Sequence, residues 1–531
     1  MIYSKKFFLR NWIIDIKLKK KFSYLFKNAE LNNNKKNIIL LEFNNWTLNH
    51  ILSAYFCDIL SKKYNARVEA YPGYQLHSSS LNQNFINKFL WSLGNKLSFK
   101  SFGIYKSFGV SNIFWPKEDL EIDQKAQKEI NKYNKMIKSK EDVQNYKINN
   151  ILIGDLIYDS FLKKNLLPTI NIKSFQFKNF FFDSIKYFFI MENYFNKNKV
   201  TAILGFHAVY LGAVSLRIGI NRNIPCYVLN IERLYSLNKK RYLSGLEYFD
   251  SKKIFKTFSK NKKKSSLKIA KKNLISRFSG LLSSDLIYSS KSAYGKKSNK
   301  RILRNSKNLK ILIAPPSFSD SPHFMGNTFF PDVYEWLECL GKISNKSNYD
   351  WYIKCHPDFT MLKDKTLYYV KKFTKKYPKI KFIDSKASHN QLISEGINYV
   401  LTVNGTISGE YPYFNVNAIN ASENHSYALY DFSITPKNRL EYIKLINNLK
   451  KPKAINKKKQ ILENYYMKYE YFNNRWFFEE LNNVKNSIKG YTNFVRHEIY
   501  KYWLDNFEIK IHKERYKRLK KFINSKNYTV T

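Results

Sequence analysis

The sequence predicts an α/β fold of two Rossmann-like domains that face each other across a cleft, with added C-terminal helices. Short apolar strands alternate with helical patterns between residues 37 and 230, and the same alternation returns between 309 and 422. Such alternation is typical of βαβ units and a parallel sheet. The chain has 531 residues, which is too long for one ordinary domain.

Shifts in composition indicate where the domains begin and end. We expect five segments: a basic amphipathic N-terminal segment (1–36), an N-terminal α/β domain (37–250), a basic connecting segment (251–308), a C-terminal Rossmann-like domain (309–440) and a C-terminal helical region (441–531). The connecting segment has Asp285 as its only acid and is rich in Ser and Lys. We expect a helix within it at 274–282.

The strands of the N-terminal domain are recognised by apolar runs that end in polar turns. We expect strands at 37–43, 66–70, 199–204 and 224–230, with helices at 46–64 and 211–219. Apolar residues recur at helical spacing through 46–64. Residues 115–150 are charged and helix-like, and 149–161 reads as an apolar strand or the start of a helix.

The C-terminal domain repeats the pattern. We expect strands at 309–314, 351–354, 381–384, 399–403 and 417–420, with a helix from Pro331 to Ile343. Pro suits the first turn of a helix, where its missing N–H has no partner to lose. From Pro436 onward the sequence is helical, with many aromatic anchors.

The formal charge of +51 is extreme and comes mostly from Lys. One interpretation is a codon bias toward A and T, because Asn, Ile, Tyr and Phe are also abundant. The other is an anionic partner: an activated phosphate compound, a lipid phosphate, a membrane surface or nucleic acid. Both interpretations remain open at this point.

Neither disulfides nor a membrane span is indicated. The four cysteines are scattered without metal-ligand spacing, as expected of reduced thiols in the cytosol,. No window reaches the roughly 20 apolar residues that cross a bilayer, because Asp183 and Lys186 interrupt the nearest one, 179–190. Residues 7–26 mix apolar and basic residues, which fits a helix on an anionic membrane or a helix packed on the protein.

Ligands of parallel sheets bind beyond the carboxyl ends of the strands, and His356 lies there, after the strand 351–354. Its imidazole can donate to a phosphate oxygen, and Pro357 restricts the backbone that presents it. Lys354 ends the same strand. Strand alternation leaves open whether its side chain faces the same way.

A polar turn of small residues, Asn404–Glu410, follows a later strand of the set. Gly405 allows a ligand to approach the backbone, and Thr406 and Ser408 offer hydroxyls. Glu410 is placed to accept from ribose hydroxyls, and a helix starting here would favour an anion. The alternative is a plain connection with Thr406 as the N-cap.

Three side chains of the N-terminal domain are candidates for a catalytic base. His207 lies just past the strand 199–204. Asp155 and Asp159 are four residues apart, so on a helix they share one face. The alternatives are a structural histidine, and carboxylates on a solvated face or at a helix cap.

Three stretches together resemble a known family. They are Lys354-Cys-His-Pro-Asp358, Asn404-Gly-Thr-Ile-Ser-Gly-Glu-Tyr-Pro-Tyr413, and Asn420-Ala-Ser422 with Asn424-His425. They resemble the C-terminal half of bacterial capsule and surface-polysaccharide biosynthesis proteins, which are GT-B-type glycosyltransferases. The His-Pro pair is similar to that of bacterial sialyltransferases, Kdo transferases and glycerophosphotransferases, where it contacts the phosphate of a CMP- or CDP-activated donor.

The resemblance covers residues 309–440 and extends faintly to 153–159 and 207–210. It implies that the C-terminal domain binds the donor, through His356, Thr406, Ser408 and Glu410, and that the N-terminal domain binds the acceptor and supplies the base. The Asp-Asp-Gly base motif of sialyltransferases is absent from the sequence, which argues against sialic acid as the donor sugar.

We therefore expect a glycosyltransferase that moves a sugar from a nucleotide-activated donor, CMP-linked donors included, to a surface-polysaccharide or lipid-linked glycan. We expect no cofactor and no metal, because no Asp-x-Asp triplet stands out. The expected location is the cytoplasm, with attachment to the anionic inner face of the membrane, and no nucleic acid is expected as a partner. One alternative is a CDP-dependent glycerophosphotransferase-like enzyme. The other, which rests on charge alone, is a nucleic-acid-binding protein.

Overall fold

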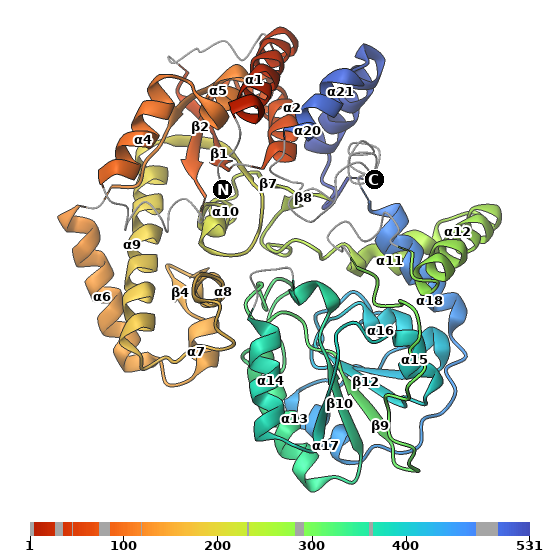
Figure 1. Cartoon of the computed structure of the whole chain (residues 1–531). Coiled ribbons are helices and arrows are strands. Elements are labelled where there is room, and N and C mark those ends of the chain that lie inside the picture. Colours follow the sequence, from red (N-terminus) through yellow and green to blue (C-terminus); the bar gives the residue numbers. More distant parts are fainter. Residues whose placement is uncertain are drawn as a thin grey trace.

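The computed structural model contains two α/β lobes joined by a helical layer (Figure 1). It describes residues 5–26, 35–44, 46–73, 85–117, 119–230, 233–281, 291–360, 365–473 and 497–530. Each lobe is built on a largely parallel sheet with helices on both faces. The predicted class, α/β with two Rossmann-like domains, is confirmed.

The first lobe, called the N lobe, has a six-stranded sheet in the order β3-β2-β1-β6-β7-β8. The strands are β1 (Asn37–Phe43), β2 (Ala66–Pro72), β3 (Val110–Ile113), β6 (Lys199–Gly205), β7 (Cys226–Leu229) and β8 (Leu234–Leu237). All pair in parallel except β8, which runs antiparallel to β7. The central strand β1 is buried on both faces, since Leu40 enters one apolar core while Leu41 enters the other. A strand buried on both faces reads as a continuous apolar run, which is why 37–43 is recognised from sequence.

The helices of the N lobe include both ends of the chain. They are α1 (Lys5–Leu25), α2 (Thr47–Tyr64), α4 (Phe85–Lys96), α5 (Lys100–Ser107), α6 (Leu120–Met136), α7 (Lys140–Gln144), α8 (Gly154–Asn165), α9 (Phe175–Lys197), α10 (Val214–Asn221), α20 (Glu498–Asp505) and α21 (Ile509–Asn524). A short hairpin, β4 (Lys147–Ile148) and β5 (Ile151–Leu152), precedes α8.

The second lobe, called the C lobe, has five parallel strands in the order β11-β10-β9-β12-β13. They are β9 (Lys310–Ile313), β10 (Asp350–Lys354), β11 (Ile380–Ile383), β12 (Tyr399–Thr402) and β13 (Asn417–Asn420). The helices are α13 (Val333–Lys346), α14 (Thr366–Lys376), α15 (His389–Ser394), α16 (Ile407–Glu410) and α17 (Arg439–Asn447). The side chain of Asp332, not Pro331, caps α13 by accepting from the backbone N–H of Glu335.

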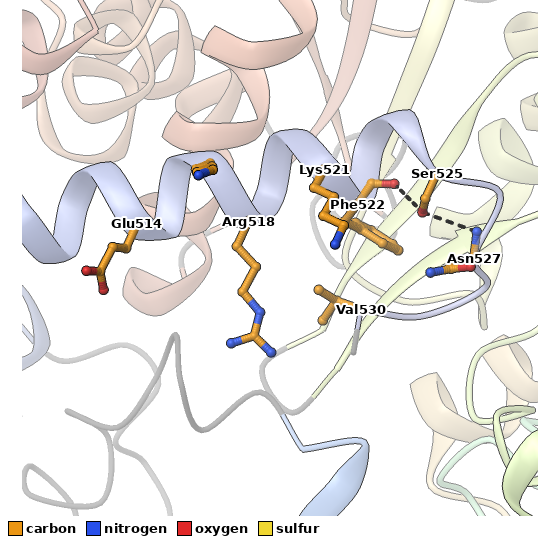
Figure 2. A pocket seen from close by; sticks show the side chains of 8 residues that line it. Glu514, Arg518, Lys521, Phe522, Ser525, Asn527 and Val530 are labelled. Atoms are coloured by element: carbon orange, nitrogen blue, oxygen red, sulfur yellow. Dashed lines mark hydrogen bonds between the residues drawn. The ribbon is translucent and has the colours of Figure 1, made fainter. Parts of the chain in front are cut away.

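The C-terminal helices do not form a region of their own. Helices α20 and α21 pack on the N lobe, where Trp503 and Phe522 join the same core as Phe22 of α1. An open groove of about 470 Å³ runs beside α21 and is lined by Arg518, Lys521 and neighbouring residues (Figure 2).

The basic connecting segment is more helical than expected. It holds α11 (Tyr248–Lys256) and α12 (Lys260–Phe278), so its second helix begins well before the predicted start at 274. These helices pack against α18 (Lys458–Tyr466) and the π-helical turn Met467–Tyr471, forming a layer on one side of the C lobe (Figure 1). Only one face of α12, with Ala270, Leu274 and Phe278, is buried, and lysines occupy much of the rest. The apolar residues are therefore few, and their helical spacing is difficult to recognise in the sequence.

The N-terminal helix α1 is packed on the protein by one face. Ile14, Leu18 and Phe22 are buried in the N-lobe core, whereas Trp12 and Tyr24 are exposed. Across the described ranges, the structure shows no helix whose length and apolar character would let it cross a membrane.

Candidate active site

The loops that follow the strands of the two sheets meet between the lobes. Tyr210, in the loop after β6, donates a hydrogen bond to Asp320 in the loop after β9 (2.8 Å), and Lys163 of α8 pairs with the same carboxylate (2.8 Å). The Asp320 side chain is 55% exposed. Even so, burial acts strongly to raise its pKa, and Lys163 and Tyr210 outweigh that effect and lower it. Asp320 therefore marks a point where the two lobes touch beside the carboxyl ends of their strands.

His356 lies at the carboxyl end of β10, on the same edge of the C-lobe sheet as the turn after β12. Its Nδ1 accepts from the backbone N–H of Asp358 (3.2 Å), and 42% of the side chain is exposed. Burial lowers its pKa, against the pull of the Asp358 carboxylate. The imidazole is therefore neutral at pH 7 with its proton on Nε2, which has no hydrogen-bond partner among the described residues. This tautomer is ready to donate to an oxyanion.

The turn after β12 divides into an open half and a closed half. Asn404, Gly405 and Thr406 are at least partly exposed, whereas Ser408 is buried and its Oγ donates to Asn420 Oδ1 (2.6 Å). Ser408 is thus used internally, contrary to the prediction that its hydroxyl faces a ligand. Helix α16 is only four residues long, so the predicted helix N-terminus cannot contribute a substantial dipole.

The predicted role of Glu410 as an acceptor for ribose hydroxyls does not fit its surroundings. Glu410 is buried, its Oε2 accepts from the hydroxyl of Tyr294 (2.6 Å), and its Oε1 pairs with Arg277 of α12 (2.6 Å). Both oxygens are engaged by the protein. The residue anchors the connecting segment to the C lobe, because a buried carboxylate needs a charged partner.

Lys354 points into the sheet-covering layer rather than to the open edge. It is buried, and its Nζ lies 3.3 Å from His389 Nε2, whose Nδ1 contacts the Tyr411 hydroxyl (2.6 Å). Burial lowers the pKa of Lys354 to about 8 and that of His389 well below its usual value. A neutral His389 therefore accepts from a Lys354 that is still charged at pH 7, close behind His356.

Lys468, from the π-helical turn, brings a second cation to the Asn404–Glu410 turn. Its Nζ donates to Ser426 Oγ (3.1 Å) and to the Tyr427 hydroxyl (3.2 Å), and that hydroxyl donates to Thr406 O (3.3 Å). Burial raises the pKa of Tyr427 to about 12, so the hydroxyl is neutral. Within the described ranges no carboxylate pairs with Lys468. Its charge lies beside this turn, linked to Thr406 through the Tyr427 hydroxyl.

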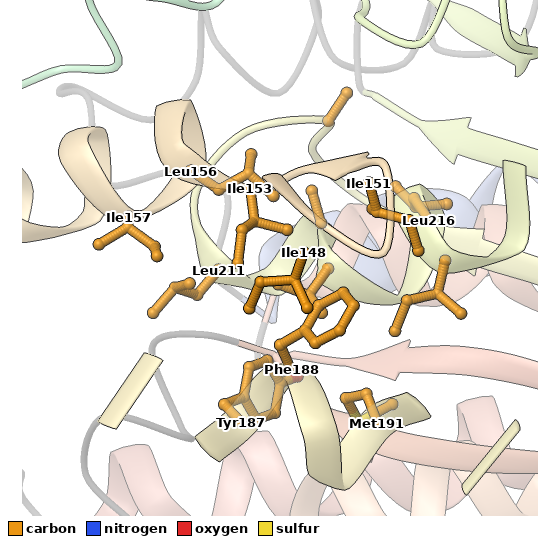
Figure 3. Packing of buried hydrophobic residues seen from close by; sticks show 14 of the residues in the cluster. Ile148, Ile151, Ile153, Leu156, Ile157, Tyr187, Phe188, Met191, Leu211 and Leu216 are labelled. Carbon is orange, nitrogen blue, oxygen red and sulfur yellow. The ribbon is translucent and has the colours of Figure 1, made fainter. Parts of the chain in front are cut away.

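On the N-lobe side, α8 is held rigidly by the hairpin before it. Its apolar residues Leu156 and Ile157 pack in one cluster with Ile148 of β4, with Phe188 of α9 and with Leu211 (Figure 3). Gly154 begins the helix where a Cβ would lie 1.8 Å from the carbonyl oxygen of Val143. Only glycine lets the helix start so close to the preceding turn.

Two of the three predicted bases lie on α8 and are already paired. Asp155 forms a buried ion pair with Arg217 (2.6 Å). Asp159 accepts from both the ring and the backbone of His323 of the C lobe, with 2.5 Å between Oδ1 and Nδ1. The prediction that the two carboxylates share a face of one helix holds. As bases they are unsuitable, because a carboxylate that takes a proton loses its own charge and leaves its buried cationic partner without compensation.

His207, the third predicted base, remains accessible. It follows β6, packs edge-to-face against Trp46 (5.1 Å between ring centroids) and is partly exposed. Its ring nitrogens have no hydrogen-bond partner among the described residues. Burial lowers its pKa to about 4, opposed by Asp320, so it is a neutral imidazole in the cleft at pH 7.

Several residues of this region were missed by sequence reasoning. They are Arg277, Tyr294, His323, His389 and Lys468. Arg277 is the single arginine between 251 and 281, which is a weak signal in a lysine-rich chain. The others carry no local signal, because their partners are distant in sequence.

No cluster of three or more metal-ligating side chains occurs among the residues that the structure describes, and independence of metal stays a prediction.

No protein-family model matches the chain, and no curated protein sequence does either. Solved structures do match. The UDP-GlcNAc 2-epimerase from Methanocaldococcus jannaschii is 11% identical, with 81% of this chain and 98% of that chain covered and a TM-score of 0.23. The Neisseria meningitidis UDP-GlcNAc 2-epimerase bound to UDP-GlcNAc is 10% identical, with 81% of this chain and 100% of that chain covered and a TM-score of 0.21. Acinetobacter baumannii MurG is 11% identical, with 85% of this chain and 100% of that chain covered and a TM-score of 0.22. Identities and TM-scores this low carry no activity, ligand or site residue over to this chain.

Proposed function

We propose that the protein transfers a sugar from a nucleotide-activated donor to a surface-polysaccharide or lipid-linked glycan acceptor. The observation that carries the proposal is that His356 and the open turn Asn404–Thr406 lie on the same edge of the C-lobe sheet, the edge from which Asp320 contacts the second lobe. A donor of this class needs its leaving phosphate neutralised, its nucleoside held and an acceptor hydroxyl brought to it.

The C lobe supplies the donor side. The Nε2–H of His356 donates to a phosphate oxygen, and the side chains of Asn404 and Thr406 bind from the turn after β12, which β9 separates from β10 in the sheet. Lys468 contributes positive charge on the far side of that turn, and Lys354 does so indirectly from behind His356. Charge-assisted hydrogen bonds of this kind strengthen as negative charge develops on the leaving phosphate.

The N lobe supplies the acceptor side. Of the three predicted bases only His207 is free of an internal pair, and its neutral imidazole can accept a proton. The Tyr210–Asp320 and Lys163–Asp320 contacts hold the lobes close enough for groups of both lobes to reach one substrate pair. Because the expected neutralising groups are all side chains, activity should survive chelation by EDTA.

The first test is a thermal-shift screen with CMP, CDP, UDP, GDP and a DNA oligonucleotide, since a ligand that binds only the native state raises the melting temperature. We expect a selective shift with one nucleotide. Replacing His356 or Thr406 by Ala should weaken that nucleotide roughly 10- to 100-fold, whereas Ser408→Ala should leave its affinity unchanged. A shift with DNA alone, lost as salt rises, would refute the proposal in favour of nucleic-acid binding.

Mass spectrometry of the products with a panel of activated donors then separates sugar transfer from the CDP-dependent alternative. Release of free nucleotide together with a glycosylated acceptor supports the proposal. Transfer of a phosphorylated polyol from a CDP donor, with release of CMP, supports the alternative. In both cases His356→Ala should abolish turnover, because the two reactions use the same leaving-phosphate site.

We further propose that the outer face of α1 and α21 holds the enzyme at an anionic membrane. On α1, Trp12, Ile13 and Tyr24 are 47%, 50% and 63% exposed, and Lys17 and Lys20 lie among them. Aromatic side chains beside lysines suit the headgroup region of a bilayer. The adjoining α21 exposes further cations: Lys510, Lys513, Lys517, Arg518, Lys520 and Lys521.

The membrane proposal is tested by sedimentation with phosphatidylcholine vesicles, with and without phosphatidylglycerol. We expect binding to the anionic vesicles only, at about 1 kcal/mol per contributing lysine. Trp12→Ala combined with Tyr24→Ala should weaken it, and Lys178→Ala, at an exposed position of α9, should not. Equal binding to both vesicle types would contradict the role of charge.

A further inference from the structure

Glu42 occupies a position at the carboxyl edge of the N-lobe sheet that the function above does not use. It is next to last in β1, and its Oε2 accepts from the backbone N–H of Phe206 (2.9 Å), which immediately follows β6. Gly73 follows β2, and a Cβ there would lie 2.3 Å from Glu42 Oε1. The carboxylate therefore lies where the ends of three adjacent strands, β2, β1 and β6, come together.

This carboxylate is surrounded by protein but has no counter-charge. Glu42 is partly exposed, and no cation pairs with it within the described ranges. The titratable groups that face it are three tyrosines, one each from β2, α5 and α9 (Tyr71, Tyr105 and Tyr187). Burial raises the pKa of all three, so they are neutral. Burial also raises the pKa of Glu42 to about 7, against the Phe206 hydrogen bond.

Glu69 on the adjacent strand is a structural carboxylate with which Glu42 can be compared. Its Oε1 pairs with Arg67 (2.8 Å), and its Oε2 accepts from the Tyr194 hydroxyl (2.6 Å). Glu42 lacks both kinds of partner. A buried carboxyl group without compensation is costly to keep, and such groups are concentrated at functional sites.

The loop that is hydrogen-bonded to Glu42 continues to a contact between the lobes. The residue after Phe206 is His207, and the same loop continues to Tyr210, which contacts Asp320 of the C lobe. We propose that Glu42 is the general base that takes the proton from the acceptor hydroxyl, an assignment that rests on the glycosyl transfer proposed above.

In the proposed step the sugar passes from the donor phosphate to the acceptor oxygen. The acceptor oxygen forms a bond to the anomeric carbon, and its proton passes to the Glu42 carboxylate. The bond from the anomeric carbon to the donor phosphate oxygen breaks, and the phosphate leaves with the electron pair, stabilised by His356 and Lys468. Glu42 then returns the proton to water. A base works best when its pKa lies near the working pH, and in that respect Glu42 is better matched than His207, whose pKa is about 4.

The first test needs no substrate. Infrared difference spectra of the native protein and of Glu42→Gln are recorded between pH 5 and 9, and the protonated-carboxyl band is followed. We expect a carboxyl group that titrates near pH 7 in the native protein and is missing from Glu42→Gln. If no carboxyl of the native protein titrates between pH 6 and 8, or if Glu42→Gln retains the band, the assignment is overturned.

The second test uses the nucleotide-sugar selected by the thermal-shift screen. We expect Glu42→Gln to lower kcat by about 10²- to 10⁴-fold, the usual contribution of a general base, with the dissociation constant of the nucleotide unchanged. The acid limb of kcat/KM near pH 7 should disappear, and Glu42→Asp should restore part of it. The control, Glu69→Gln, should keep the limb.

The two proposals fail in different ways. Full turnover by Glu42→Gln, with turnover lost in His207→Ala and an acid limb near pH 4, would overturn the role of Glu42 and leave glycosyl transfer standing. A native protein that binds none of the nucleotides would overturn glycosyl transfer itself. Should Glu42→Gln fail to fold, Glu42→Asp carries both tests, because it keeps the carboxylate and displaces it by one methylene.

Discussion

The His323–Asp159 pair should make the closed arrangement of the lobes depend on pH. Both side chains are almost fully buried, and each ring nitrogen of His323 faces an acceptor, Asp159 Oδ1 at 2.5 Å and Pro331 O at 2.9 Å. The doubly protonated ring donates to both acceptors, and the side-chain amide of Gln144 also contacts Nε2 and donates to Pro331 O (2.6 Å). Burial opposes the charge, but the Asp159 carboxylate prevails and raises the pKa of His323 from 6.5 to about 9.

The size and sign of the effect follow from linkage. At about 1.4 kcal/mol per pKa unit, the difference between 6.5 and about 9 is worth about 3 kcal/mol. A raised pKa means that the native state holds the proton more tightly than the unfolded state. The stabilisation is therefore complete below pH 6.5 and is lost as the pH rises toward 9.

Urea denaturation of the native protein and of Asp159→Asn, at pH 6.5 and pH 9, measures this effect. We expect the variant to be about 3 kcal/mol less stable at pH 6.5, with most of that difference gone at pH 9. The control is Asp320→Asn, which breaks the exposed Lys163–Asp320 pair across the same interface. Exposed pairs contribute about 1 kcal/mol or less, and the Asp320 carboxyl, whose pKa Lys163 and Tyr210 lower, stays ionised from pH 6.5 to 9. A stability difference for Asp159→Asn that stays constant from pH 6.5 to 9 would refute the reasoning.

Three further predictions concern residues that hold the site in place. Gly154→Ala should lower the melting temperature by several degrees and weaken the contact between α8 and the C lobe, because its Cβ meets the Val143 carbonyl oxygen; calorimetry measures the first effect and limited proteolysis the second,. Arg217→Met leaves Asp155 buried without a partner and should cost about 3–5 kcal/mol in urea denaturation, with recovery in the double variant that adds Asp155→Asn. Ser408→Ala leaves Asn420 Oδ1 without its donor and should cost about 1–3 kcal/mol, while a titration should give the native nucleotide affinity.

The strands and the two-lobe plan were predictable because they depend on local patterns. Strand β1 matches the expected range 37–43, and β13 matches 417–420. Both lie inside parallel sheets, where an apolar run is needed whatever the rest of the chain does. The placement of His356 and Thr406 on one sheet edge follows from the same logic, since parallel strands bring their carboxyl ends together.

The partners of the site residues could not be predicted, because each partner lies far along the chain. The sequence predicts that Glu410 faces a ligand, whereas the structure pairs it with Arg277. The sequence likewise predicts that Asp159 is a base, whereas the structure pairs it with His323. Nothing near either residue indicates these pairings. Glu42 was missed for the opposite reason, because it lies inside a strand and its significance comes from the lack of a cationic partner among the described residues.

Helices α20 and α21 pack on the N lobe, so the N-lobe core cannot be completed during synthesis until these helices have been translated. Strands β1 and β2 leave the ribosome early, but the core that covers one face of their sheet includes Trp503, Leu519 and Phe522. That core stays incomplete until almost the whole chain has been translated, although α1, α2 and α5 also contribute to it. All five strands of the C lobe, in contrast, are available before residue 421. The half of the molecule that begins the chain is consequently the last to close, and a nascent chain stalled before residue 497 would display its unfinished apolar surface to chaperones.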